Sequence, residues 1–145
     1  MKKIYLLLLL PVIISSCSFR LYKSYEDKII STWELSRVKV SRWDKPENMA
    51  FTRGVFRFYP SGNLEYKDQY GHIYSGTWIM KDVRIHSSSD SSGSSVTSLY
   101  ITVVDFENHV LKTEIFDDMI FFGQSSFRAY LDRKGRNIFY FNKLQ

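Results

Sequence analysis

The stretch from Phe56 to Met80, FRFYPSGNLEYKDQYGHIYSGTWIM, constrains the fold of this chain more than any other segment. Up to Tyr59 it alternates between Phe and polar residues, which is the period-two pattern of a half-buried strand. The run Pro60-Ser61-Gly62-Asn63 interrupts the pattern with residues that favour a tight turn. Alternation resumes in Leu64–Lys67 and again in Ile73–Met80. The segment therefore predicts three antiparallel strands joined by short turns.

The same alternation continues to the end of the chain. It is clearest in Val96–Val104, Val110–Phe116 and Ser125–Asp132, and a turn at Lys81-Asp82 is expected to precede a short strand, Val83–His86. No long segment has the periodicity of a helix. Roughly eight or nine short strands at regular spacing indicate an all-β fold, and we expect an antiparallel up-and-down β-barrel. A closed barrel would leave no strand edge exposed.

Three local patterns add detail. In the first strand, Ser31–Val40, the apolar parity shifts by one residue at Ser36-Arg37, which predicts a β-bulge. Ser24 and Asp27 have the spacing of a helix cap, so this region is either a single helical turn or a disordered linker. Ser87–Ser95 contains no apolar residue and is either a tolerated loop insertion or a mobile lid at a barrel mouth.

The first residues have the features of an export signal. Lys2 and Lys3 precede a short apolar run, Ile4–Ile14, that is too short to span a bilayer. The residues Ile14-Ser15-Ser16-Cys17 resemble a bacterial lipobox. This resemblance implies a signal peptide over residues 1–16, acylation of Cys17, and a lipidated tether over residues 17–29 ahead of one domain, residues 30–145. Several acyl chains on Cys17 would anchor the protein stably to a membrane.

Composition agrees with an exported, lipid-anchored protein. Cys17 is the single cysteine, so no internal disulfide can form. The net charge is +5, but the basic residues are scattered, and we expect no nucleic-acid partner. Ser18 follows the cysteine, which by resemblance to Gram-negative lipoproteins indicates the outer membrane. Phe19 and Arg20 replace the acidic residues of surface-exported lipoproteins, which favours the periplasmic face of the cell envelope.

The chain resembles the lipocalin-like domains of small bacterial lipoproteins from about Ile30 to Leu144. The resemblance rests on three short motifs: Ser31-Thr32-Trp33-Glu34-Leu35 in the first strand, Phe56-x-Phe58-x-x-x-Gly62, and Gly76-Thr77-Trp78. It implies an antiparallel barrel with an apolar interior that in some members holds a small hydrophobic ligand. It also implies that an arginine, Arg128 or its rival Arg136, stacks on Trp33 and closes one end of the barrel by a cation–π contact.

No residue pattern in the sequence indicates catalysis or a bound metal. His72, His86 and His109 are spread over different turns and strand ends, without metal-ligand spacing. Neighbours on a strand point to opposite faces, so the carboxylates of Asp117-Asp118 would not converge. Ser36 and Lys39 have the spacing of an acylating serine motif, but in a strand rather than on a helix. We expect a non-enzymatic protein without a cofactor.

The interior is the remaining candidate site. The aromatic residues expected to face it are Trp33, Phe56, Phe58, Tyr66, Tyr74, Trp78, Phe116 and Tyr130. An eight-stranded barrel either fills completely with side chains or admits one small ligand. The first hypothesis is a lipid-anchored protein that binds a small apolar molecule among these rings. The alternative is a filled barrel whose loops, including Arg42–Ala50 with Trp43 and Ser87–Ser95, contact another envelope protein.

Overall fold

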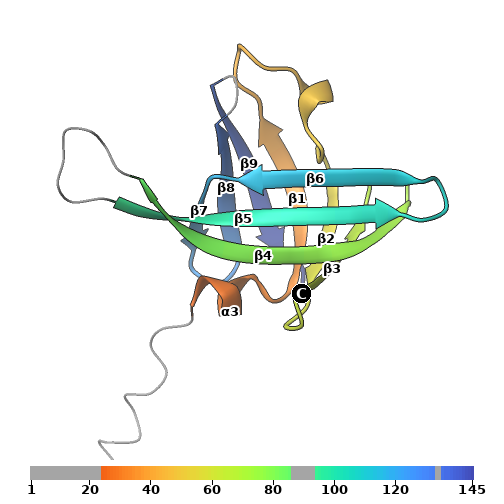
Figure 1. Ribbon diagram of the computed structural model, residues 1–145, viewed down its shortest axis with the longest axis horizontal. Coiled ribbons are helices and arrows are strands. Elements are labelled where there is room, and N and C mark those ends of the chain that lie inside the picture. Colours follow the sequence, from red (N-terminus) through yellow and green to blue (C-terminus); the bar gives the residue numbers. More distant parts are fainter. Residues whose placement is uncertain (1–23, 86–93, 133–134) are drawn as a thin grey trace, which may run out of the picture.

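A computed structural model describes residues 24–85, 94–132 and 135–145 of the chain. Nine antiparallel strands form one sheet, preceded by the short helix α3 (Tyr25–Ile29) and interrupted by one 3₁₀ turn, η1 (Pro46–Asn48) (Figure 1). The strands are β1 (Thr32–Lys39), β2 (Gly54–Phe58), β3 (Asn63–Lys67), β4 (Ile73–Ile85), β5 (Ser94–Asp105), β6 (Val110–Phe116), β7 (Asp118–Phe122), β8 (Ser126–Asp132) and β9 (Arg136–Lys143). The all-β, antiparallel fold predicted from the sequence is confirmed.

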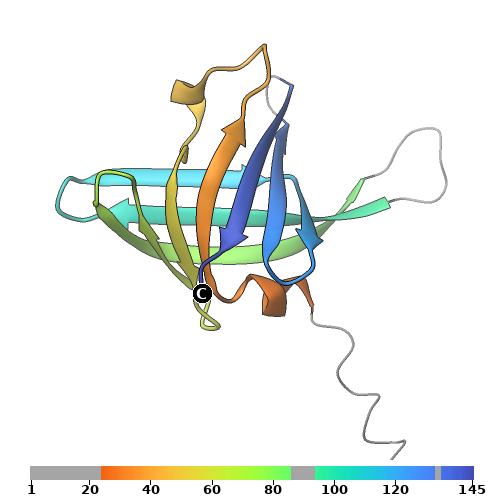
Figure 2. The same cartoon turned by 180° about the vertical axis from the view of Figure 1, so that it is seen from behind.

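The order of strands in the sheet is β6-β5-β4-β3-β2-β1-β9-β8-β7. Neighbours along the chain are neighbours in the sheet except for β6 and β7, and the first and last strands also pair, so the predicted meander is present. Figure 2 shows the β1–β9 pair and β8 from behind, crossing the direction of β4, β5 and β6. The sheet therefore folds back over itself and encloses an interior.

The sheet is not closed into a barrel, and that part of the prediction is wrong. β6 and β7 lie at opposite ends of the strand order and do not pair with each other. Only Asp117 separates them, so the chain passes from one to the other without the reversal that a hairpin requires. Asp117 lies where the two ends of the sheet meet, because its N–H donates to Tyr130 O (2.8 Å) and its carbonyl accepts from Ser98 Oγ (3.1 Å).

Most local predictions agree with the structure. The pairing of β1 with β9 shifts register between Leu35 and Arg37, which is the predicted bulge. Ser24 and Asp27 form a reciprocal capping box at the start of α3, so this region is a helical turn. The predicted turn at Lys81-Asp82 is wrong. β4 continues through it because the long ladder with β5 pairs both residues, and Thr97 Oγ1 donates to Asp82 Oδ1 (2.9 Å).

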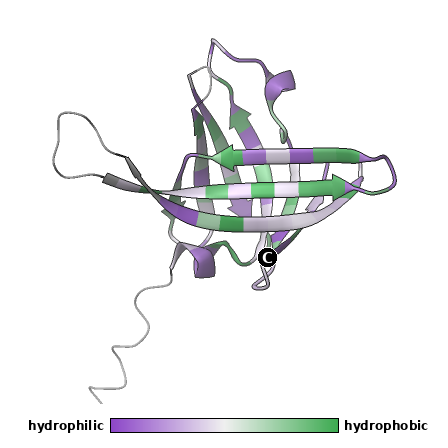
Figure 3. Ribbon diagram, in the orientation of Figure 1, coloured by the Kyte–Doolittle hydropathy of each residue, from purple (hydrophilic) through white to green (hydrophobic). Residues whose placement is uncertain are grey.

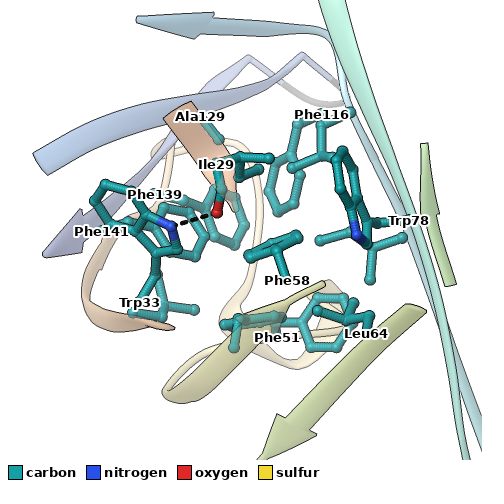
Figure 4. Packing of buried hydrophobic residues seen from close by; sticks show 14 of the residues in the cluster. Ile29, Trp33, Phe51, Phe58, Leu64, Trp78, Phe116, Ala129, Phe139 and Phe141 are labelled. Carbon is teal, nitrogen blue, oxygen red and sulfur yellow. Dashed lines mark hydrogen bonds between the residues drawn. The ribbon is translucent and has the colours of Figure 1, made fainter. Parts of the chain in front are cut away.

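The alternation in sequence becomes the division between interior and surface. Figure 3 shows it as alternating hydrophobic and less hydrophobic bands along β5. The buried set draws on all nine strands and on α3. Figure 4 shows Phe58 and Phe116 among the labelled rings of this core. Phe116 of β6 lies 4.9 Å from Phe139 and 6.2 Å from Phe141 of β9, measured between ring centroids, so residues from distant parts of the sheet meet across the interior.

Helix α3 covers one end of this interior. Trp33 is fully buried at the start of β1, and its Nε1–H donates to the carbonyl of Ile29 over 2.7 Å (Figure 4). This bond satisfies a buried indole donor and an orphan carbonyl at the end of the helix together. Ile29 is itself fully buried, so the helix is attached by both packing and hydrogen bonding.

Gly76, within the Gly-Thr-Trp motif, allows β4 and β5 to approach closely. A Cβ built at this position meets the carbonyl oxygen of Thr102 and lies 2.6 Å from Val103 Cα, so any side chain would collide with backbone. The glycine is therefore required by packing rather than by a positive φ.

Gly76→Ala should lower the free energy of unfolding by about 1–3 kcal/mol, because the backbone of β5 must move to admit the methyl group. Urea unfolding monitored by tryptophan fluorescence measures this. Ser75→Ala is the matched control, since Ser75 is exposed on the same strand and its change should stay within about 0.5 kcal/mol. Equal stability of the two variants would contradict the close approach.

Candidate functional site

The interior predicted to hold a ligand is occupied by its own rings. Of the eight residues expected there, seven lie in the buried cluster: Trp33, Phe56, Phe58, Tyr66, Tyr74, Trp78 and Phe116. These rings contact one another, with centroids 4.5 Å apart for Phe56 and Tyr66 and 5.7 Å apart for Phe58 and Trp78. The arrangement favours the filled interior over a ligand pocket.

Two of the predicted positions point away from this interior. Phe127, Ala129 and Leu131 of β8 face inward, so Arg128 and Tyr130 have the opposite parity. Tyr130 lies outside the buried cluster and is covered by the Arg136 guanidinium, 4.0 Å from its ring centroid. Tyr130, although 8% exposed, is therefore not among the rings that pack together in the interior, and the alternation in β8 was a sequence signal for this.

Arg128 does not stack on Trp33, which corrects the predicted contact. Its guanidinium lies over Phe122 and Tyr140 on the outer surface, at 4.6 and 5.1 Å from their ring centroids. The cation near the buried indole is Lys143, whose Nζ is 5.9 Å from the Trp33 ring centroid. Trp33 faces inward and Arg128 outward, so the two cannot meet across the sheet.

Three exposed aromatic side chains define a different candidate site. Trp43 is 71% exposed, Tyr70 77% and Phe106 74%. They lie in the β1–β2, β3–β4 and β5–β6 connections, away from α3; the β3–β4 and β5–β6 turns lie side by side, whereas the β1–β2 connection projects separately beyond β1 (Figures 1 and 2). We call these connections (residues 40–53, 68–72 and 106–109) the loop end.

A buried asparagine holds the connection that carries Trp43. Asn137 is 0% exposed on the inward face of β9. Its Oδ1 accepts from the N–H of Ser41 (2.8 Å), and its Nδ2 donates to Asp44 Oδ2 (3.0 Å). Trp43 lies between these two anchored residues, with the Arg42 guanidinium 5.4 Å from its ring centroid.

Asp68 organises the turn that carries Tyr70. Its Oδ1 accepts from the N–H groups of Tyr70 (2.9 Å) and His72 (3.0 Å), and its Oδ2 lies 3.1 Å from His72 Nδ1. The backbone closes the turn as well, because Asp68 N–H donates to His72 O (3.0 Å). An aspartate that accepts from the residues after it is a recurrent device for rigid turns.

Asp105 does the same for the turn that carries Phe106. It is 3% exposed, and its Oδ1 accepts from the N–H groups of Glu107 (3.0 Å) and Asn108 (3.1 Å). Its Oδ2 accepts from Asn108 Nδ2 (2.7 Å). His109 ends the turn with φ +55°, and its Nδ1 is 3.0 Å from the Phe106 carbonyl.

Hydrogen bonds lower the pKa of both turn carboxyls. Burial alone would raise the pKa of Asp68, but the hydrogen bonds from the backbone and ring of His72 and from Tyr70 N–H outweigh it and hold the pKa below its ordinary value. For Asp105, the hydrogen bond from the Asn108 side chain is the main cause that lowers the pKa. Both turns are therefore built around carboxylates that stay ionised.

Two tyrosines and a lysine lie beneath these turns. Tyr66 donates its O–H to Arg53 O (2.6 Å), and burial followed by the neighbouring Asp68 charge raises its pKa. The same two causes raise the pKa of Tyr74. Lys112 Nζ lies 4.6 Å from the Tyr74 ring centroid, within cation–π range. The phenols stay neutral and serve as packing and hydrogen-bonding groups.

One groove of about 360 Å³ connects the two turns. Its lining comes from both: Gly71, His72 and Ile73 on one side, and Asp105, Phe106, Glu107 and Asn108 on the other. Ile73 is 58% exposed, so the groove has an apolar edge and an acidic one.

The described residues contain neither a candidate metal site nor a candidate membrane-spanning helix. Within residues 24–85, 94–132 and 135–145, no group of three metal-ligating side chains converges, and no helix has the length and apolar character to cross a bilayer. Cys17, His86 and most of the Ser87–Ser95 segment lie outside the described residues. No protein-family model, curated protein or solved structure matches the chain.

Apart from Trp43, no residue of the loop end was predicted from the sequence, although a signal for it is present. Asp105 follows Leu99, Ile101 and Val103 at the same inward parity, and Asn137 precedes Phe139 and Phe141 in the same way. A polar residue at the end of an inward-facing apolar series indicates a side chain that forms hydrogen bonds with backbone groups rather than with water.

Asp68→Asn should lower the free energy of unfolding by about 1 kcal/mol at pH 7, because the charge-assisted hydrogen bonds weaken. A lowered folded pKa stabilises the protein above the ordinary aspartate pKa of about 4, and this contribution disappears as the pH falls through the folded value. In urea unfolding, the stability difference between the variant and wild type should therefore shrink as the pH falls through the lowered folded pKa of Asp68.

Glu65→Gln, on the exposed face of β3, is the control and should differ from wild type by less than about 0.5 kcal/mol. A pH-independent difference between Asp68→Asn and wild type would contradict the role assigned to the carboxylate.

Proposed function

We propose that this protein is a lipid-anchored, non-enzymatic interaction module of the cell envelope. In this proposal the curled, open sheet is a lipocalin-like domain, its interior is solid, and the loop end binds another envelope protein. Nucleic acid is not a partner. The observation that supports it best is the contrast between the packed interior rings and the three exposed aromatic side chains on anchored turns.

The packed interior argues against the hypothesis that the protein binds a small apolar molecule among these rings. Seven of the eight rings expected to line a pocket are at most 9% exposed and lie in one cluster. A small apolar ligand would have to displace several of them, and each buried ring stabilises the fold by about 2–3 kcal/mol. Binding of such a molecule would therefore compete directly with folding.

The loop end has the properties of a preformed binding surface. Aromatic residues dominate the energetics of protein interfaces, and rigid ones lose little entropy on binding. Asn137, Asp68 and Asp105 hold the connections in which the three exposed aromatic residues lie, by hydrogen bonds to Asp44, Tyr70 and Glu107 respectively. Their side chains are exposed while their backbones are anchored, which suits a partner that offers apolar pockets.

The described part of the chain begins at the opposite end of the molecule. Ser24 caps α3, which covers the end of the interior away from the loop end, and Cys17 precedes it by seven residues. An acylated Cys17 would hold the α3 end near the membrane. The loop end would then project into the periplasm from the outer membrane, where it would be accessible to a partner.

Cys17→Ala should release the protein from the membrane fraction, since the acyl chains supply the anchor. Fractionation of cells followed by immunoblotting measures this, and globomycin treatment should cause the uncleaved precursor to accumulate. Ser18→Ala is the control and should remain in the membrane fraction. Retention of Cys17→Ala in the membrane would contradict lipid anchoring.

Trp43→Ala, Tyr70→Ala and Phe106→Ala should each reduce cross-linking to a partner in intact cells by at least tenfold if they are interface anchors, a loss of about 1.4 kcal/mol or more. Their exposure predicts little change in stability. Phe122→Ala, on an exposed aromatic of β7 (44% exposed), is the matched control.

Native mass spectrometry distinguishes this proposal from the hypothesis that the interior binds a small apolar molecule. Native mass spectrometry of the purified protein should show the mass of the polypeptide and its acyl chains alone. An additional apolar compound, lost on denaturation, together with unchanged cross-linking by the three variants, would replace the interaction proposal with a ligand-binding one.

A further inference from the structure

Strand β4 has a free edge over half its length. It pairs with β5 from Ser75 to Ile85, but with β3 only from Ile73 to Thr77. The next bond on the β3 side runs from Trp78 N–H to Gly62 O (2.9 Å). Because alternate residues of a strand direct their backbone groups to the same side, those of Met80 and Asp82 face this edge. Beyond Trp78, the described residues supply no backbone partner there.

Two adjoining grooves, of about 390 and 620 Å³, run along this edge. Their common lining residues are Glu26 and Met80, so they form one continuous channel. Helix α3 and the β2–β3 turn (Pro60–Gly62) form its other wall. Figures 1 and 2 both show α3 beside β4 on the side away from β5.

The channel presents both faces of β4. Ile79 and Tyr100 contribute from the outer face of the sheet, and Trp78 and Met80 from the inner face. An added strand alternates its side chains between the two faces, so each would meet an apolar surface. From Met80 to Ile85 the edge is about 17 Å long, enough for five or six extended residues.

The charges of the channel select for a basic occupant. Glu26 and Asp82 are the charged residues among its lining, and both are acidic. They lie on opposite walls, one on α3 and one on β4. A lysine or arginine in the added strand would lie between two carboxylates, whereas an acidic residue would be repelled.

We propose that the free edge of β4 binds an extended segment of another polypeptide by β-strand addition, with alternating apolar residues and at least one lysine or arginine. Backbone hydrogen bonds to Met80 and Asp82 provide affinity, and the Glu26–Asp82 pair provides selectivity. This surface is separate from the loop end and does not depend on its proposed role.

The test uses the full chain in detergent micelles and a fluorescein-labelled peptide, Thr-Val-Lys-Val-Thr-Val. Fluorescence anisotropy should show saturable binding, and backbone hydrogen exchange should slow at Met80 and Asp82. The same peptide N-methylated at alternate residues should bind at least tenfold more weakly, because it lacks the donors for one edge. Equal binding of the two peptides would overturn strand addition.

Variants of the protein test separately how the backbone hydrogen bonds and the charge of Asp82 contribute to peptide binding. Asp82→Pro removes the edge N–H and should weaken binding at least tenfold, whereas Asp82→Asn keeps it and should lose only the preference for lysine over glutamine in the peptide. Binding unchanged by Asp82→Pro would overturn the proposal. Tighter binding of a peptide with the sequence of residues 18–23, competing with the probe, would also overturn it by assigning the edge to this chain.

Discussion

Mutual burial of aromatic rings holds this structure together. The sheet has two unpaired ends, so hydrogen bonding alone would allow it to lie open. Phe127 and Phe141 stack with centroids 4.3 Å apart, and Phe116 packs on Phe139 and Phe141 from the far end of the strand order. Burying such rings contributes about 2–3 kcal/mol each. The gain in buried apolar area therefore keeps the sheet curled, although no hydrogen bonds between β6 and β7 close it.

The inward faces of the strands also carry polar residues that fix the conformation of the loops. Asp105 and Asn137 occupy inward positions at the loop-end termini of β5 and β9 and are almost fully buried. Glu114, on the inward face of β6, accepts from Ala50 N–H (3.4 Å) in the β1–β2 connection. Within the described residues, no buried side-chain polar atom lacks a partner. The loops are thus extensions of the core, and the aromatic residues on them are presented in defined positions.

The two proposed binding surfaces differ in physical origin. The loop end relies on exposed rings with anchored backbones, so its selectivity would come from shape and apolar contact. The β4 edge relies on backbone groups left free beyond the Asn63–Thr77 pair, where β3 begins, so its affinity would come from hydrogen bonds with little dependence on sequence. Natural edges are often protected by charge, and Asp82 and Glu26 fit that description as well as recognition.

The sequence by itself determined the all-β class, the order of the meander, the bulge at Ser36 and the inward set of most strands, because these follow from alternation between neighbouring residues. It failed at Lys81-Asp82, where a twelve-residue partner strand overrode local turn propensity. Only the tertiary structure decided whether the interior is filled, since that depends on ring contacts between distant strands. It also decided that the sheet stays open at Asp117 and that Arg128 faces solvent, because closure and stacking depend on how remote segments meet in space.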